Sequence, residues 1–349
     1  MNEVSVGIIG ARFAADLHTT SYSRLTGVRI AAICDKDEAT VKEFASARGI
    51  PDYYTDYRPM LERKDIDLIS VCVPNFLHHE MVLAAAEAGK DIICEKPLAT
   101  KLSDAEEMVA VCREAGVKLM YAEDWIFAPS LVRAEEIYKE GAIGEALYIT
   151  GKESHSGSHS PFAMKKEYCG GGAMIHLGIH PIGYVLHFVA EAPEKVVGVV
   201  SGGNEANLLH PQFEGEDWAV GILDFPSGVK ALVEGNYITQ GGMDDRLEIY
   251  GTEGVIRVDL TQGSPISVYS GKGFSYAIEK ADMTAGWTRP AIDEYWSLGY
   301  QNEIAHFVAA VRDDKELPIG VRPEDGLLAL KVTTAIYESA ASGQAVRLS

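Results

Sequence analysis

The stretch VSVGIIGARFAA, Val4 to Ala15, decides the fold of the first part of this chain. Val4 to Ile9 is a run of apolar and small residues, which is typical of a strand buried on both faces. Gly10 to Ala15 forms a glycine-led turn, and the residues after it are predicted to be helical to about Tyr22. A buried strand that passes through such a turn into a helix is typical of the first βαβ unit of a dinucleotide-binding domain.

The turn itself departs from the dinucleotide fingerprint G-x-G-x-x-G/A. The chain has Gly10-Ala11-Arg12-Phe13-Ala14-Ala15, so the first glycine and the final small residue are present. Arg12 replaces the second glycine, which normally lets the backbone approach the pyrophosphate, but its guanidinium can contact phosphate directly. Taken alone, this motif does not decide between a cofactor site and an ordinary turn.

Asp35 strengthens the cofactor interpretation. It follows a second apolar run, Val28 to Cys34, where an acid accepts hydrogen bonds from the adenosine ribose. An acid there repels a 2′-phosphate, so NAD is favoured over NADP. The structural alternative, compatible with the first, is that Asp35 caps the following helix.

Strands and helices alternate through the first part of the chain, which predicts a parallel sheet and a Rossmann domain over residues 1–122. The expected strands after the first two are 53–55, 68–73, 91–94 and 118–121, and the expected helices are 37–48, 56–62, 78–88 and 103–115.

Two strand ends in this domain carry further candidate residues. The run KDIICEKP, Lys90 to Pro97, places Glu95 and Lys96 at the carboxyl end of a strand, where open α/β sheets bind ligands. A strand-end lysine is more often a solvated surface charge, so the prediction depends on its neighbours. Pro74, Asn75 and His78 follow another strand end, close to where a nicotinamide is expected.

The pattern changes after residue 122, and residues 123–349 are predicted to form an α+β domain. Strands expected at 145–153, 196–201, 218–225, 229–237, 246–251 and 255–259 make a large, mostly antiparallel open sheet, with helices at 130–140, 173–189, 294–312 and 323–341. An open sheet leaves a broad face, which predicts a homo-oligomer, a homodimer or homotetramer.

The segment GAMIHLGIH, Gly172 to His180, carries the chemistry of the second domain. His176 and His180 are four residues apart on a predicted helix, and three glycines, 170–172, give the preceding backbone freedom. One alternative is that these histidines are ordinary hydrogen-bonded residues of the protein core. A zinc site is another, because HxxxH is a zinc-ligand spacing and Glu153, His155 and His159 could supply further ligands. The glutamate that follows the first histidine in zincin helices is absent, however, and no metal is predicted. His155 otherwise belongs to a polar substrate loop or a solvated loop.

The composition of the chain limits the kinds of partner that it is expected to bind. With 31 Lys and Arg against 51 Asp and Glu, the net charge is −20, which argues against nucleic acid and anionic membranes. No apolar run approaches the ~18 residues of a membrane span, and no secretory signal is visible. The odd number of cysteines, 5, without a CxxC pair predicts reduced core thiols in a cytoplasmic protein.

The combination of the Gly10 turn, Asp35, Pro74-Asn75 with His78, Glu95-Lys96-Pro97, and a GGG helix ending in His180 resembles the Gfo/Idh/MocA oxidoreductase family. The resemblance runs nearly end to end and implies an NAD-dependent enzyme that oxidises a secondary hydroxyl of a sugar, sugar derivative or cyclitol. Lys96 matches the family's EKP lysine, and His180 matches the histidine of its D-x-x-x-H motif. His176 stands where that motif has aspartate.

The resemblance implies that His180 takes the hydroxyl proton while Lys96 stabilises the developing alkoxide. His176 is expected to contact a substrate hydroxyl and to share the proton with His180. Tyr237 and Trp287 are expected to stack on a sugar face. Two alternatives keep the cofactor: a redox-neutral lyase or glycosidase, and a non-catalytic NAD(H)-binding protein. The sugar, the oxidised carbon and the direction are not predicted.

Overall fold

The computed structural model describes residues 3–158, 160–261, 263–274 and 285–348 of the chain. It divides into two compact units. The first comprises Met1–Glu123 and Tyr300–Leu327, and the second comprises Asp124–Gly299 and Leu328–Ser349.

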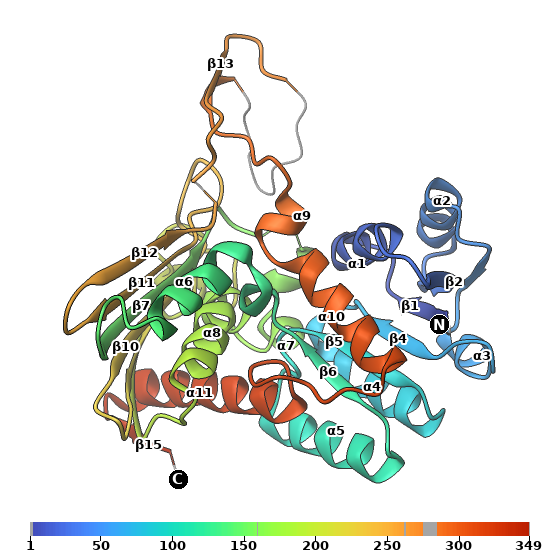
Figure 1. Cartoon of the computed structure of the whole chain (residues 1–349), viewed down its shortest axis with the longest axis horizontal. Helices are drawn as coiled ribbons and strands as arrows, with labels where there is room; N and C mark the ends of the chain where they lie inside the picture. Colours follow the sequence, from blue (N-terminus) through green and yellow to red (C-terminus); the bar gives the residue numbers. More distant parts are fainter. Residues whose placement is uncertain (1–2, 159, 262, 275–284, 349) are drawn as a thin grey trace. The chain divides into compact units, whose positions relative to one another are not determined.

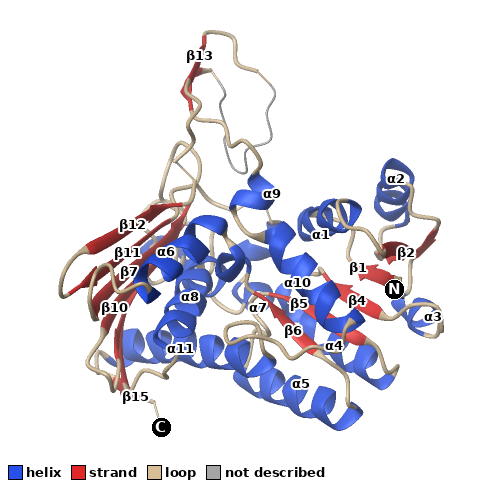
Figure 2. Cartoon of the chain, in the orientation of Figure 1, coloured by secondary structure: helices blue, strands red, loops and turns tan. Residues whose placement is uncertain are grey.

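The first unit is built on a parallel sheet with the strand order β3-β2-β1-β4-β5-β6. The strands are β1 (Val4–Ile9), β2 (Val28–Cys34), β3 (Asp52–Tyr54), β4 (Leu68–Val71), β5 (Asp91–Glu95) and β6 (Leu119–Ala122). The helices are α1 (Phe13–Ser23), α2 (Glu38–Arg48), α3 (Tyr57–Leu61), α4 (His78–Glu87) and α5 (Leu102–Ala115). Figure 1 shows α1 beside α2, and Figure 2 separates the red strands of the sheet from the blue helices. This is the predicted Rossmann topology.

All strands of this sheet are paired in parallel, and its inner strands β1 and β4 are apolar on both faces. Every residue of β1 and β4 is buried, as continuous apolar runs predict for a sheet covered by helices on both sides. All five cysteines are buried and free, as predicted.

The second unit contains a seven-stranded sheet in the order β12-β11-β7-β10-β9-β8-β15. Its strands are antiparallel except for the parallel pair β7 and β10. They are β7 (Ala146–Ser154), β8 (Lys195–Val200), β9 (Trp218–Asp224), β10 (Lys230–Asn236), β11 (Arg246–Gly251), β12 (Val255–Asp259) and β15 (Val346–Arg347). The helices of this unit include α6 (Pro129–Lys139), α7 (Lys166–Cys169), α8 (Ile179–Val189), α9 (Glu294–Ser297) and most of α11 (Pro323–Ser342). The mostly antiparallel sheet confirms the predicted fold class.

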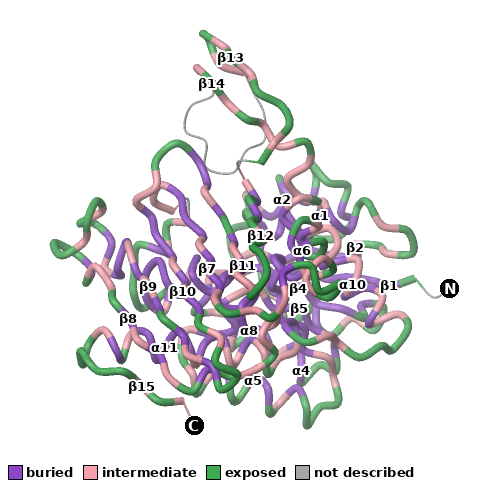
Figure 3. The backbone as a smooth tube through the Cα atoms, turned by 60° about the vertical axis from the view of Figure 1, so that its left-hand side comes forward, coloured by how far each residue is buried: buried purple, intermediate pink, exposed green. Residues whose placement is uncertain are grey.

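The large sheet has one covered face and one open face. Pro181 of α8 approaches Gly151 of β7, and Ile336 of α11 approaches Gly198 of β8. Along the strands, buried residues alternate with intermediate or exposed ones, as the purple, pink and green segments in Figure 3 show. Leu147, Val199 and Ile222, none of them buried, belong to the outward-facing set. The homo-oligomer that would bury this face stays a prediction.

One predicted helix is interrupted, and the interruption matters for the domain boundary. The expected helix 294–312 is observed as α9 and as α10 (Tyr300–Arg312), because Gly299 adopts a φ of 106° between them. A Cβ on Gly299 would lie 2.0 Å from the carbonyl oxygen of Asp124, so only glycine fits there. The chain passes back to the first unit at this point, and α10 packs on α1. The prediction had assigned 123–349 to one domain, whereas the structure returns residues 300–327 to the first.

Candidate active site

The turn after β1 has the geometry of a dinucleotide-binding turn. Gly10 has a φ of 107°, and a Cβ there would lie 2.1 Å from the carbonyl oxygen of Cys72. Glycine is therefore required for the ends of β1 and β4 to lie this close. Arg12 is exposed at the N-cap of α1, and its side chain makes no capping hydrogen bond in the described structure. The first amide groups of α1 are thus not capped by this side chain, which suits an anionic ligand.

Asp35 connects this turn to the end of β2. Its carboxylate accepts hydrogen bonds from the backbone N–H of Ala11 (3.1 Å) and of Asp37 (3.0 Å). The N-cap of α2 is Asp37, whose carboxylate accepts from Thr40 N–H, so the capping alternative for Asp35 does not apply. Asp35 stays half-buried beside the Gly10 turn, the position from which it would meet a ribose.

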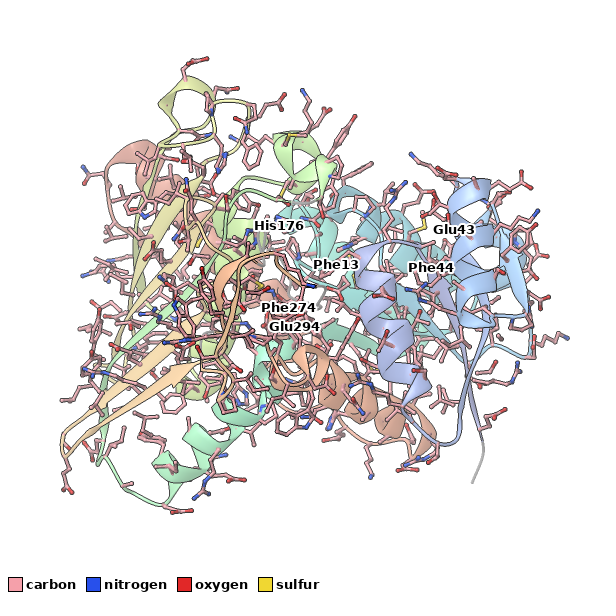
Figure 4. All side chains as sticks on the ribbon, turned by 90° about the horizontal axis from the view of Figure 1, so that it is seen from above. Phe13, Glu43, Phe44, His176, Phe274 and Glu294 are labelled. Carbon is pink, nitrogen blue, oxygen red and sulfur yellow. The ribbon has the colours of Figure 1, made fainter. Side chains whose placement is uncertain are left out.

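The helices beyond this turn are held to each other by a charged contact. Arg48 of α2 donates to the carboxylate of Asp16 on α1, and its guanidinium lies 3.9 Å from the ring centroid of Phe44. Figure 4 shows Phe13 at the start of α1 and Phe44 on the neighbouring α2. Phe13 is 40% exposed although it is aromatic, which leaves its ring accessible at the predicted cofactor turn.

The strand-end residues of β4 and β5 are tied together through His78. This histidine is fully buried, and its ring nitrogens lie 2.8 Å from the carbonyl oxygen of Pro97 and 3.0 Å from that of Val73. Both nitrogens therefore contact backbone, and burial lowers the pKa of His78. These contacts hold the loop after Lys96, and the cofactor contact of His78 stays a prediction. Pro74 begins the short helical turn that holds the buried Asn75.

Glu95 is anchored by His18. The Nε2 atom of His18 lies 2.9 Å from the Glu95 carboxylate, and the backbone N–H of Lys96 lies 3.3 Å from its other oxygen. Burial raises the pKa of Glu95, but the hydrogen bond from His18 and the charges of His18 and Lys96 outweigh it, so the pKa lies below its ordinary value. An ionised Glu95 thus fixes the backbone that carries Lys96. The Lys96–Pro97 peptide bond is cis.

In the second unit, His180 lies between two carboxylates. Its Nδ1 is 3.2 Å from Asp124 and its Nε2 is 3.5 Å from Glu153, and all three side chains are buried. The ring also stacks on Trp125, with the ring planes 14° apart. An acceptor at Nδ1 fixes the orientation of an imidazole. A histidine held in this way can accept and return a proton.

The helix that carries both candidate histidines begins with a π-helical turn, η4 (Met174–Gly178), and continues as α8. Its start is held by the buried Glu216 and by the half-buried Tyr337. Glu216 accepts from the N–H of Met174 (2.9 Å) and from the Tyr337 hydroxyl (2.8 Å). A Cβ on Gly172 would lie 2.1 Å from the Glu216 carbonyl oxygen. Glycine 172 is therefore needed for close packing and not for the freedom that the sequence suggested.

His176 has a different set of partners from His180. Its Nδ1 lies 2.5 Å from the hydroxyl of Tyr237, and its ring is 6.0 Å from that of Phe162. Figure 4 labels His176 in the second unit. Tyr237 is fully buried in a cluster with Ala173, Leu177 and Phe213. The predicted stacking of Tyr237 on a sugar does not fit this burial, because its ring faces are covered by protein.

The two remaining predicted substrate residues, His155 and Trp287, lie in different surroundings. His155 is buried, with its ring 5.5 Å from that of Tyr237. Trp287 is 75% exposed on the two-stranded sheet β13 (Val268–Ser270) and β14 (Gly286–Thr288), where it packs edge-on against Tyr269. His159 lies outside the described residues.

Sequence reasoning missed Asp124 altogether and considered Glu153 only as a metal ligand. Glu153 could have been found from its place at the end of a predicted strand, because Lys96 was singled out for the same reason. Nothing local distinguished Asp124, because its partner His180 lies 56 residues further along the chain.

A parallel sheet entered through a glycine turn, with an acid at the end of its second strand, is typical of dinucleotide-dependent oxidoreductases. The family model described as an oxidoreductase family, NAD-binding Rossmann fold, matches residues 4–123. The model described as the C-terminal alpha/beta domain of the oxidoreductase family matches residues 136–348. The chain therefore belongs to the Gfo/Idh/MocA oxidoreductase family, which confirms the predicted family and the predicted class of enzyme.

Relatives of known sequence support the same assignment over the full length. An uncharacterized oxidoreductase, YrbE of Bacillus subtilis (strain 168), is 29% identical over 99% of this chain and 97% of that protein. A D-apiose dehydrogenase of Paraburkholderia graminis is 28% identical over 98% of this chain and 88% of that protein. The crystal structure of GenD2 from gentamicin A biosynthesis, in complex with NAD, matches with a TM-score of 0.92 at 24% identity, covering 100% of this chain and 97% of that one. At this identity the likeness shows the fold.

The residues of the first unit fit the predicted cofactor, NAD, which the family assignment confirms. Gly10 and the start of α1 suit the pyrophosphate, and Asp35 suits an unphosphorylated ribose.

One run of the described residues, Lys166–Val189, is long and apolar enough to cross a membrane. Of its apolar window 78% is buried in the protein, as in a core helix. Cytoplasmic location stays a prediction.

Proposed function

We propose that this chain is an NAD-dependent dehydrogenase that oxidises a secondary hydroxyl of a sugar, a sugar derivative or a cyclitol. The observation that carries the proposal is the buried His180 between Asp124 and Glu153 in the second unit. Dehydrogenation of an alcohol requires a group that removes the hydroxyl proton, and histidine is the side chain best suited to this at neutral pH. Several further relatives are named as inositol dehydrogenases, which supports a polyhydroxylated substrate.

Each residue is assigned a role from its surroundings. His180 takes the hydroxyl proton, and Asp124 holds its ring through Nδ1. Glu153, near Nε2, stabilises the imidazolium that forms. Lys96, at the end of β5, donates a hydrogen bond to the reacting oxygen and stabilises its developing negative charge. NAD, when bound, supplies the acceptor for the hydride.

The first unit supplies the cofactor contacts. Gly10, Arg12 and Phe13 form the turn against the pyrophosphate side of NAD, and Asp35 accepts from the adenosine ribose, which favours NAD over NADP by charge. Pro74, Asn75 and Glu95 shape the nicotinamide end, and His78 fixes the loop on which Lys96 lies.

The test is a panel of sugars, sugar acids, glycosides and inositols with NAD and NADP, followed by the absorbance of the reduced cofactor. We expect turnover with at least one compound and a preference for NAD. His180→Ala and Lys96→Ala should each lower kcat by about 10²–10⁴-fold while NADH binding is kept. Parent-like turnover in both variants would refute the assignment.

Two substitutions of residues with no role in the proposed site serve as matched controls. His187→Ala removes a histidine from the same helix α8, where it pairs with Glu135, and Lys101→Ala removes an exposed lysine of the first unit. Both should keep the parent rate. Cofactor binding without turnover of any compound would favour the non-catalytic alternative, and conversion without net NADH would favour the redox-neutral one.

A further inference from the structure

The catalytic helix, formed by η4 and α8, begins with backbone N–H groups that donate to two other parts of the second unit. The N–H of Ala173 donates to the backbone carbonyl oxygen of Glu216 (2.8 Å), and the N–H of Met174 donates to the Glu216 carboxyl group (2.9 Å). The N–H of Ile175 donates to the Tyr337 hydroxyl (3.1 Å). The first N–H groups of a helix have no partner inside the helix, and water or a ligand commonly binds them. Here Glu216 and Tyr337 bind them instead.

The Tyr337 hydroxyl uses its full hydrogen-bonding capacity at this point. Besides the N–H of Ile175, the N–H of Gly172 donates to it (3.3 Å), and its own proton is donated to the Glu216 carboxyl group (2.8 Å). One donated and two accepted bonds are all that a hydroxyl oxygen can make. Tyr337 lies on α11, 162 residues further along the chain than Ile175. A single oxygen atom therefore joins α11 to the start of the catalytic helix.

Three glycines allow these segments to approach closely enough for such bonds to form. A Cβ on Gly171 would lie 2.3 Å from the Tyr337 hydroxyl oxygen, and a Cβ on Gly215 would lie 2.3 Å from the carbonyl oxygen of Gly171. At the other end of η4, a Cβ on Gly235 of β10 would lie 2.6 Å from the backbone nitrogen of Gly178. The π-helical turn is thus held at its start by hydrogen bonds and at its end by close packing on the sheet.

A π-helical turn is rare, and it changes the direction of the side chains that it carries. Its hydrogen bonds span five residues instead of four, so it holds one residue more than an α-helical turn. Side chains within such a turn therefore point in a different direction, relative to those that follow, than they would in a continuous α-helix. His176 lies within η4, and His180 follows it in α8. The turn sets the angle between the two histidines, so contacts that hold the turn also hold that angle.

We propose that Tyr337 and Glu216 are positioning residues of the proposed dehydrogenase, which hold η4 and thereby keep His176 and His180 at the angle that the reaction requires. Both act through the backbone of the catalytic helix. The inference rests on the proposed function for its effect on turnover, whereas the hold of the Tyr337–Glu216 pair on the helix can be measured without turnover.

The first measurement is hydrogen–deuterium exchange, read by mass spectrometry on peptides that cover residues 170–180. Tyr337→Phe removes only the hydroxyl oxygen, so exchange in these peptides should become at least about tenfold faster. Ser339→Ala is the matched control from the same helix α11, because the Ser339 hydroxyl accepts from the N–H of Gly198 in β8 instead (3.0 Å). It should leave exchange at residues 170–180 unchanged. Parent-like exchange in Tyr337→Phe would overturn the inference.

The second measurement compares kcat, the Kd for NADH and the thermal midpoint, with the best substrate of the panel. Tyr337→Phe should lower kcat by about 10- to 100-fold, because a small misplacement of a reacting group has an effect of this size. Its Kd for NADH should stay at the parent value. Ser339→Ala also removes a hydroxyl that accepts from a backbone N–H and should lower the thermal midpoint, yet it should keep the parent kcat. Equal kcat values in the two variants would show that the Tyr337 hydroxyl has no positioning role.

Two substitutions of Glu216 test whether its oxygen atom is what holds the helix. Glutamine keeps an oxygen that accepts from the N–H of Met174 and from the Tyr337 hydroxyl, whereas leucine has no acceptor. The kcat of Glu216→Gln should therefore exceed that of Glu216→Leu by at least about tenfold. Similar kcat values would remove Glu216 from the proposal, and if Glu216→Leu did not fold, Tyr337→Phe would decide the question. If no compound of the panel turned over, the dehydrogenase proposal would fail, and the exchange measurement would still decide whether the pair holds the helix.

Discussion

Replacing Asp124 by asparagine tests whether the carboxylate beside His180 contributes to proton transfer. Asparagine has nearly the same shape, and its amide oxygen can still accept from Nδ1 of His180, but the negative charge is lost. The two groups are 3.2 Å apart and buried, so water does not screen the interaction strongly. A hydrogen bond to a charged group is worth about 1.5–3 kcal/mol and a neutral one about 0.5–1.5 kcal/mol, so the substitution removes a difference of about 1–1.5 kcal/mol. If this difference is realised as the imidazolium forms, its loss lowers kcat by about 5- to 13-fold.

The assay is steady-state reduction of NAD with the best substrate of the panel, together with a fluorescence titration of NADH. We expect kcat to fall and the Kd for NADH to stay at the parent value, because Asp124 belongs to the second unit. Asp224→Asn is the matched control: Asp224 pairs with Lys195 and Lys230 on the surface of the same unit and should leave kcat unchanged. A parent-like kcat in Asp124→Asn would refute the positioning role of this carboxylate.

Three further substitutions test the cofactor turn and the start of the catalytic helix. Gly10→Ala should lower the thermal midpoint and abolish NADH binding, because a Cβ would lie 2.1 Å from the Cys72 carbonyl oxygen. Gly89→Ala is the control: this glycine also has a positive φ, but a Cβ there would have nothing within 4 Å, so the thermal midpoint should fall much less. Equal losses of thermal midpoint in the two variants would contradict the steric argument. Asp35→Asn should reduce the preference for NAD over NADP, measured as the ratio of kcat/KM values, by roughly tenfold because charge repulsion of the 2′-phosphate is removed; an unchanged ratio would count against the ribose contact. Burial raises the pKa of Glu216 above 4.5, so its contribution to stability is present at low pH and is lost as pH rises through the raised pKa. Glu216→Gln, which stays neutral, should therefore gain thermal midpoint relative to the parent as pH rises above about 4.5, and a pH-independent difference would show that the carboxyl group does not titrate in this range.

The first unit follows closely from the sequence because its signals are local. Continuous apolar runs that end in Gly10 or Asp35 indicate buried parallel strands, and the ends of such strands bring the polar residues to one edge of the sheet. His78 shows the limit of this reasoning. Its position after a strand was predicted correctly, but its use of both ring nitrogens on backbone carbonyls depends on the path of the Pro97 loop.

The candidate site of the second unit depends on contacts between distant parts of the chain, so less of it can be predicted from the sequence. Strands and helices were predicted from their periods, yet the partners of the two histidines come from distant segments: Asp124, Glu153 and Tyr237. The break at Gly299 has a local signal in the sequence, a glycine inside a helical pattern. A prediction made from hydrophobic periodicity alone does not use this signal.

The return of residues 300–327 to the first unit has a consequence for how this protein is made. The N–H of Tyr121 in β6 donates to the carbonyl oxygen of Val321, and Arg113 of α5 pairs with Glu324. A fragment ending at residue 122 would leave the last strand of its sheet without this cover and would expose the side of α1 on which α10 packs. During synthesis, the nucleotide-binding unit therefore cannot be completed until residues 300–327, which follow most of the second unit in the chain, have left the ribosome.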